Sequence, residues 1–174
     1  MSDGNGTMRA LVVYETIWGN TGALAEATAE GLRGSAGVER VDLVAAAEAP
    51  AAIDPEIDLV VVGGPTHAFS MSTVSSRSNA RQQGATEIPA RGIREWIDGL
   101  TPPSSAVAVA TFDTRTVKPR LPGSAAKKAM KALVAKGFRP VDSPKTFGVH
   151  GYSGPTADGE LERARAWGAT LTDA

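Results

Sequence analysis

The sequence predicts a three-layer, doubly wound α/β sandwich, in which helices cover both faces of a five-stranded parallel sheet. Two observations carry this prediction. Short aliphatic runs alternate along the chain with stretches of helical periodicity, the pattern of parallel strands joined by helical crossovers. The 174 residues, 42% hydrophobic and 21% charged, also fit an ordinary globular protein. Because crossovers are right-handed and short, few strand orders remain, and we expect the order 2-1-3-4-5.

The first half of the chain supplies three of these strands. Residues 10–14 form an uninterrupted aliphatic run, so we expect a strand buried on both faces. A helix over 21–33 follows and ends at Gly34. The alternation of apolar and polar residues over 38–44 predicts a half-exposed strand, and the aliphatic run in 58–63 predicts a central one.

Two helices and a fourth strand are expected next. Residues 92–100 carry one apolar stripe at the spacing i, i+3, i+4 and i+7, namely Ile93, Trp96, Ile97 and Leu100. Residues 106–111 form the expected fourth strand. Ser124 is placed to cap a helix that Gly137 ends. The apolar stripe of that helix consists of Ala126, Ala129, Met130, Leu133 and Val134.

The end of the chain supplies the fifth strand and the last helix. We expect the strand at 145–150, with 138–141 as an extended lead-in. Asp158 is expected to cap the helix, whose inward residues are Leu161, Ala164, Gly168 and Leu171. No repeat or linker divides the chain. We therefore expect residues 1–7 to be a flexible tail and 8–174 to be one domain.

Composition excludes several kinds of chemistry. The chain has no cysteine, which excludes disulfides, thiol catalysis and Cys-ligated metals. With only His67 and His150 as further soft ligands, we expect no metal, and any redox chemistry needs an organic cofactor. The net charge of −1 gives no reason to expect nucleic acid as a partner. The longest aliphatic run, 59–62, is too short to cross a membrane, and residues 1–7 lack a signal-peptide pattern, so we expect a cytoplasmic protein.

Positive charge is concentrated in one part of the chain. Six basic residues follow Asp113 with no acidic residue between them, namely Arg115, Lys118, Arg120, Lys127, Lys128 and Lys131. The ordinary interpretation of such a run is a solvated loop and helix face.

The turn after the first strand has the features of a phosphate site. It leads directly into a helix, whose N-terminus offers free backbone N–H groups and the positive end of the helix dipole. Thr16 and Thr21 add hydroxyl donors, Asn20 adds an amide, and Gly19 allows close approach. The turn contains no Lys or Arg, and it matches neither the Walker A loop nor the dinucleotide-binding turn. The pattern indicates a phosphate monoester held by neutral donors.

The same turn resembles a known family signature. Residues 13–21 are similar to the phosphate-binding segment of flavodoxins, an aromatic residue followed by Ser/Thr-x-Thr-Gly-x-Thr. The resemblance implies that the cofactor is FMN and that Thr16, Gly19, Asn20 and Thr21 contact its phosphate, with Ile17 and Trp18 in the same loop. Trp18 stands where the family usually has Thr. One hydroxyl donor to a charged oxygen is thereby lost, worth about 1.5–3 kcal/mol at most.

Two further loops would hold the flavin ring. Residues 63–71 resemble the Gly-x-Pro-Thr/Ser segment of the family, in which Pro65 makes the turn rigid and Thr66, His67 and Phe69 are the candidates for ring contacts. Thr111, Phe112 and Asp113 follow the fourth strand, where the family also packs a loop against the flavin. Phe112 could stack on the ring or point into the core, and the sequence leaves both open.

The segment between these loops, about 70–91, shows no clear periodicity. Loops of this length are usually functional or disordered. Because it begins beside the expected flavin ring, our hypothesis is that it forms a lid or a surface for partner docking.

Three functions remain open, in decreasing order of preference. The first is an FMN-binding electron carrier that exchanges electrons with a redox partner protein or a small-molecule acceptor. The second is an enzyme, an FMN-dependent NAD(P)H oxidoreductase that reduces quinones or other small molecules. The third is a flavodoxin-fold binding module that has lost FMN. The sequence singles out no catalytic residue, because it shows no carboxylate pair, triad or metal cluster.

Overall fold

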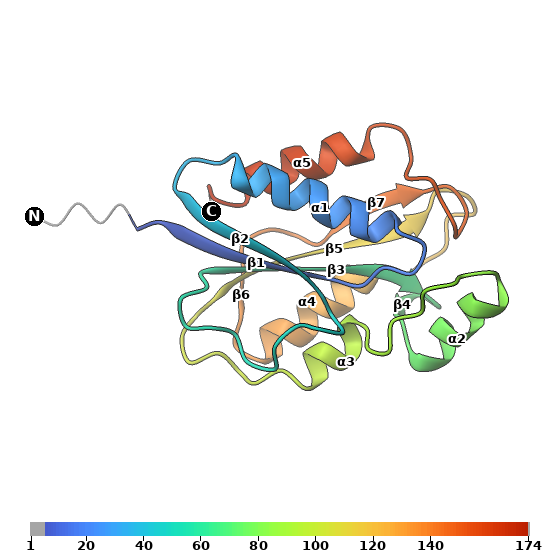
Figure 1. Ribbon diagram of the computed structural model, residues 1–174, viewed down its shortest axis with the longest axis horizontal. Coiled ribbons are helices and arrows are strands. Elements are labelled where there is room, and N and C mark those ends of the chain that lie inside the picture. The colour runs from blue at the N-terminus through green and yellow to red at the C-terminus, as the bar shows by residue number, and fades with distance from the viewer. Residues whose placement is uncertain (1–5, 174) are drawn as a thin grey trace, which may run out of the picture.

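The computed structural model describes residues 6–173 and contains the three expected layers. Figure 1 shows α1 (Asn20–Arg33) and α5 (Glu160–Thr170) on one face of the sheet, with α3 (Ile93–Asp98) and α4 (Ala125–Ala135) on the other. A further helix, α2 (Val74–Gln82), lies beside the hairpin at one end of the sheet. The doubly wound α/β class is confirmed.

The strand order agrees with the expected 2-1-3-4-5, although the sheet has seven strands and not five. The order is β2-β1-β3-β5-β6, and each of these neighbours pairs in parallel. The expected fifth strand is divided into β6 and β7, which pair with the start and the end of β5. The extra strand β4 pairs antiparallel with the end of β3. The strands are β1 (Met8–Tyr14), β2 (Val38–Ala45), β3 (Leu59–His67), β4 (Ser70–Met71), β5 (Ala108–Thr116), β6 (Arg139–Pro140) and β7 (Lys145–Val149).

The aliphatic run of β1 is buried on both faces, as its composition predicts. Ala10 and Val12 belong to the core under α1 and α5, whereas Leu11 and Val13 belong to the core under α3 and α4. Successive side chains point to opposite faces of a strand. One continuous apolar run therefore supplies two separate cores.

The two helices on the first face approach very closely. A Cβ atom at Gly168 would lie 2.2 Å from the carbonyl oxygen of Thr28, and one at Gly31 would lie 2.0 Å from that of Arg165. Only glycine allows this approach without a shift of the helices.

Two central strands are longer than expected. β3 continues to His67 and β5 to Thr116, beyond the predicted ends at residues 63 and 111. The ends of both strands were not predicted because they contain polar residues, which are unusual inside a buried strand. Their backbones nevertheless pair with neighbouring strands of the sheet. The loops of interest consequently begin several residues later in the chain.

The segment without periodicity contains α2, which was not expected. Only Arg77 and Ala80 of its nine residues are buried, so it shows no apolar stripe. Its start is fixed by a capping box, in which the Thr73 hydroxyl accepts from the backbone N–H of Ser76 and the Ser76 hydroxyl accepts from that of Thr73. Local hydrogen bonding replaces the missing apolar pattern.

Three details of the later helices were predicted wrongly. The N-cap of α5 is Gly159, at φ 80°, and not Asp158. Leu161 is exposed and Trp167 occupies the buried face of α5 instead. Val134 at the end of α4 is also exposed.

The N-terminal tail was expected over residues 1–7, and residues 1–5 lie outside the described part. The Thr7 hydroxyl donates to Glu39 Oε2 at 2.6 Å. Within residues 6–173, no helix has both the length and the apolar character that a membrane span requires.

Candidate functional site

A cavity of about 400 Å³ opens at the carboxyl ends of the parallel strands, the position at which doubly wound folds bind ligands. Its volume lies within the range of small-molecule sites, about 300–1,000 Å³. The lining residues come from the turn after β1, the ends of β3, β5 and β7, and α2. They are Ile17, Trp18, Asn20, Thr21, Pro65, Thr66, His67, Ala68, Ser76, Asn79, Ala80, Gln83, Thr114, Arg115, Thr116, Leu121, Val149, Gly151 and Tyr152.

The N-terminus of α1 faces this cavity with its donors available. Gly19, the N-cap residue, has φ 94° and donates its N–H to Thr16 Oγ1 at 3.1 Å. Among the described residues no side chain caps this helix, and its first turn holds no acid. The N–H groups of Asn20, Thr21 and Gly22 lack acceptors within the helix. The turn therefore combines free donors with a positive helix end.

The N-terminus of α4, nearby at the same edge of the sheet, is occupied by the protein itself. The N–H of Ala125 donates to Thr66 Oγ1 at 3.1 Å, and that of Ala126 to Asp113 Oδ2 at 3.0 Å. Ser124 accepts from the N–H of Lys127 at 3.2 Å. Because these acceptors fill the first turn of α4, the end of α1 is the better anion site of the two.

Trp18 forms an aromatic wall of the cavity. Its ring centroid lies 5.4 Å from that of Tyr152, with the planes inclined by 49°. Trp18 also packs against a small apolar cluster of Ile17, Ala80 and Ala85. At the position where the flavodoxin signature usually has Thr, Trp18 therefore offers an apolar surface. This surface connects the turn before α1 with α2.

The hairpin between β3 and β4 ends in a strained turn. Ala68 has φ 46° and Phe69 has φ 72°, both in the left-handed region that favours glycine. A two-residue hairpin with a type I′ turn requires positive φ at both central positions, usually met by Asn-Gly. The turn packs against Gly123, where a Cβ atom would lie 2.2 Å from the carbonyl oxygen of Phe69. Strain of about 1–3 kcal/mol for such a residue is commonly found at functional sites.

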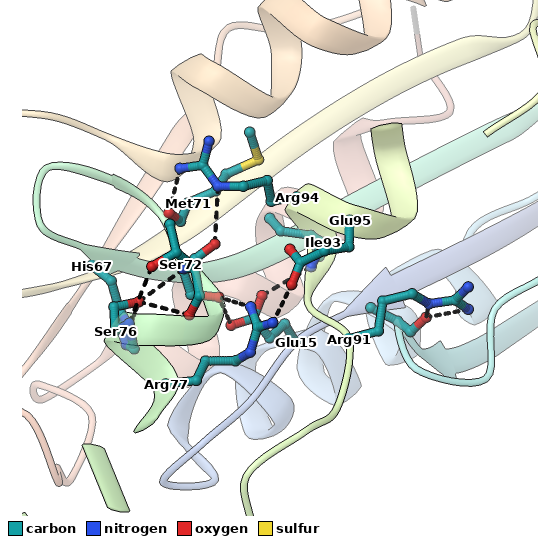
Figure 2. A network of polar contacts seen from close by, with 12 residues as sticks. Glu15, His67, Met71, Ser72, Ser76, Arg77, Arg91, Ile93, Arg94 and Glu95 are labelled. Atoms are coloured by element: carbon teal, nitrogen blue, oxygen red, sulfur yellow. Dashed lines mark hydrogen bonds and ion pairs between the residues drawn. The ribbon is translucent and has the colours of Figure 1, made fainter. Parts of the chain in front are cut away.

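A buried polar network fastens α2 to the sheet (Figure 2). Arg77 is 1% exposed; it donates to the Ser72 hydroxyl at 2.8 Å and forms an ion pair with Glu95. Ser72 donates to Glu15 Oε2 at 2.5 Å, and Glu15 Oε1 accepts from the N–H of Ile93 at 2.9 Å. The network thereby links the end of β1, the start of α3 and α2. This arrangement holds α2 in place as a wall of the cavity.

Burial raises the pKa of Glu15, and the hydrogen bonds from Ser72 and Ile93 oppose that rise only in part. Burial also acts on Glu95, but the hydrogen bond and charge of Arg77 outweigh it, so the pKa of Glu95 is lowered. The network also leaves no room for a side chain at position 92, because a Cβ atom on Gly92 would lie 2.2 Å from Glu15 Oε1.

His67, at the end of β3, is hydrogen-bonded to Ser76 in the capping box of α2. The Ser76 hydroxyl accepts from the N–H of Thr73 at 2.8 Å and donates to the Thr73 carbonyl at 3.1 Å. The same hydroxyl lies 3.0 Å from His67 Nδ1, so the ring is hydrogen-bonded to the start of α2. Burial and then the nearby Arg77 cation lower the pKa of His67.

The structure separates the expected third-loop residues from the cavity. Thr111 donates its hydroxyl to the Ala126 carbonyl at 2.9 Å, and Phe112 and Asp113 are completely buried. Because β5 continues beyond them, Thr114, Arg115 and Thr116 line the cavity instead. Thr21 lies next to this strand, with its hydroxyl 2.9 Å from that of Thr114.

The other expected residues are placed around the cavity as follows. Ile17, Trp18, Asn20, Thr21, Pro65, Thr66 and His67 line it. Thr16 and Gly19 do not line it, but their hydrogen bond shapes the turn. Phe69 points outward from the strained turn and is 52% exposed.

Sequence reasoning missed the residues from α2 and Tyr152. Ser76 and Asn79 lie in α2, and Gln83 is its C-cap residue; periodicity did not reveal this helix. Tyr152 follows β7, and its position after a strand was the available signal, since all such loops meet at one edge. Within residues 6–173, no group of three or more His, Cys, Asp or Glu side chains could hold a metal ion.

Comparison with known proteins defines the fold. No protein-family model and no curated protein matches the chain. Among solved structures, Flavodoxin 1 from Bacillus cereus is 15% identical, with a TM-score of 0.67 over 95% of this chain and 97% of that one. Flavodoxin 2 from the same organism is 19% identical, with a TM-score of 0.65 over 95% and 98%.

A larger protein also contains a similar unit. The flavodiiron protein from Giardia intestinalis is 18% identical, with a TM-score of 0.61 over 98% of this chain but 37% of its own. The chain is thus an α/β protein with a ligand-sized cavity at its strand ends. Its fold is the flavodoxin-like fold.

Proposed function

We propose that the chain binds FMN in the cavity at the strand ends and acts in electron transfer. The observation that carries this proposal is the open N-terminus of α1. Its free N–H groups, the Asn20 side chain that lines the cavity and the absence of any acid in the first turn suit a phosphate monoester. When bound, the flavin would supply the capacity to accept and return electrons.

The other cavity residues fit the remainder of such a cofactor. Trp18, Pro65 and Tyr152 offer apolar and aromatic surface, which excludes water and orients a planar ring. His67 and Thr66 supply polar groups at the same end of β3. A combination of apolar walls and orienting polar groups is the usual composition of a cofactor site.

The first test is the visible spectrum of the purified protein before and after addition of FMN and gel filtration. A retained flavin band with a perturbed long-wavelength shoulder is the expected result. A protein that stays colourless and does not retain FMN would contradict the proposal and favour a binding module. Steady-state oxidation of NADPH with a quinone then separates an enzyme from an electron carrier.

A second test addresses the phosphate end directly. Asn20→Asp is isosteric and places a carboxylate in the first turn of α1, where it stabilises the helix but repels a phosphate. The variant should bind FMN at least tenfold more weakly, while its affinity for riboflavin, which lacks the phosphate, stays unchanged. Asn79→Asp, which lines the cavity from α2, is the matched control. Equal losses for both flavins would show that the phosphate lies elsewhere.

A further inference from the structure

Positive charge is concentrated in one segment of the chain, which begins at the mouth of the cavity. Residues 114–141 contain eight Lys and Arg and no Asp or Glu, whereas the whole chain has a net charge of −1. The remainder therefore carries a net charge of −9. The charges are thus unevenly distributed along the sequence, although the overall charge is nearly neutral.

Six of these cations lie at the end of β5, in the loop 117–123 and in the first two turns of α4, namely Arg115, Lys118, Arg120, Lys127, Lys128 and Lys131. All except Arg115 are exposed. None of the six forms an ion pair with any residue in the described range. Their charges are therefore available to a partner.

Hydrogen bonds fix these segments to the rim of the cavity. Arg115 lines the cavity and donates to the Leu121 carbonyl, and Thr116 donates to the Pro119 carbonyl at 3.1 Å. The first residue of α4 is held to Thr66 of β3, as described above. The basic segments and the cavity thus share one edge of the molecule.

Exposed apolar side chains lie at the same edge. Phe69 is 52% exposed in the strained turn, and that turn packs against Gly123 of the basic loop. Leu121 and Tyr152, which line the cavity, are 52% and 56% exposed. Apolar anchors surrounded by charge are typical of protein interfaces, whereas contacts to nucleic acid are mainly polar.

We propose that this basic rim, formed by Arg115, the loop 117–123, residues 127–131 of α4 and the turn at Phe69, docks a protein with an acidic surface. The inference rests on the proposed function, because it places the partner at the mouth of the cavity from which electrons would pass. Opposite charge accelerates such encounters, and electron-transfer interfaces are small and weak. The affinity should therefore depend strongly on salt.

Two forms of one probe protein test whether binding at the basic rim requires an acidic partner, and the test does not need bound flavin. Native cytochrome c is basic, and succinylated cytochrome c is acidic around the same haem group. Titrated into the 15N-labelled protein, the succinylated form should shift the amide signals of residues 115–131 and Phe69, and the shifts should weaken as salt is raised. Native cytochrome c should produce none of these shifts. Binding of native cytochrome c with equal strength, or shifts at other residues, would overturn the proposal.

Matched variants test the surface itself. Lys128→Glu should weaken binding of the succinylated probe about tenfold at low salt. The variant should fold normally, since acidic residues near a helix N-terminus are favourable. Arg139→Glu makes the same charge change in β6, at the opposite end of β5, and should leave binding unchanged. Equal effects of both variants would indicate bulk charge only and overturn the proposal.

Two additional measurements separate the outcomes. A 20-base-pair DNA duplex that shifts the same signals more strongly than the acidic protein would overturn the choice of partner. If the purified protein retains FMN, photoreduction followed by stopped-flow mixing should show faster electron transfer to the succinylated form. If FMN is not retained but the acidic probe still binds at the rim, the docking surface stands and the proposed redox function fails.

Discussion

A substitution of Phe112 tests whether the extension of β5 places this residue in the core and not beside the cofactor. Its ring is completely buried, with centroids 5.9 Å from Phe147 and 6.0 Å from Trp167 in edge-to-face arrangements. It also fills the space beside Gly63, where a Cβ atom would lie 2.0 Å from the ring. Phe112→Ala therefore removes a packed core side chain, at a cost of about 3–5 kcal/mol in the free energy of unfolding.

Urea unfolding followed by fluorescence measures this loss. With a slope of about 2 kcal/mol per molar urea, the midpoint should fall by about 2 M. The folded variant should retain the affinity of the parent protein for FMN, because the ring does not reach the cavity. Phe69→Ala is the control. It removes an exposed ring, and Ala at position 69 has about the same backbone strain as Phe, so the free energy of unfolding should change by only about 0.5 kcal/mol.

The opposite pattern would refute this assignment. If Phe112→Ala left the urea midpoint unchanged but abolished FMN binding, the ring would have to contact the cofactor. The sequence alone allowed both roles, so the experiment distinguishes them directly.

Three further predictions follow from the packing and the buried charges. Gly168→Ala should destabilise the protein by about 1–3 kcal/mol in the same assay, because the new methyl group meets the Thr28 carbonyl, whereas Gly99→Ala has room and should not destabilise it. Burial raises the pKa of Glu15 above its ordinary value of 4.5, so its contribution to stability is full below that pH and is lost as pH rises through the folded pKa. Unfolding measured from pH 4 to 8 should show this decline in the parent protein and not in Glu15→Gln; parallel curves would contradict it. Burial lowers the pKa of His67 below 6.5, so its contribution is present above pH 6.5 and is lost as pH falls through the folded pKa. An NMR titration that gave His67 an ordinary or raised pKa would contradict this effect of burial.

The sequence by itself determined the layers, the strand order and the position of the turn that leads into α1. Residues 10–13 of β1 are all aliphatic, so this run was expected to be buried on both faces. The turn at Thr16–Thr21 was found because a strand followed by a helix always presents the helix N-terminus at the carboxyl end of the sheet. These features are local in sequence, and a local pattern suffices to predict them.

The tertiary structure alone decided which residues of the later loops reach the cavity. The extension of β5 to Thr116 depends on pairing with β3 and β7, and this pairing moved Phe112 into the core and Thr114 to the cavity. The helix α2 is held by Arg77 through partners at Ser72 and Glu95, which no periodicity reveals. Pairing partners and buried ion pairs join residues far apart in the chain, and so only the folded structure specifies them.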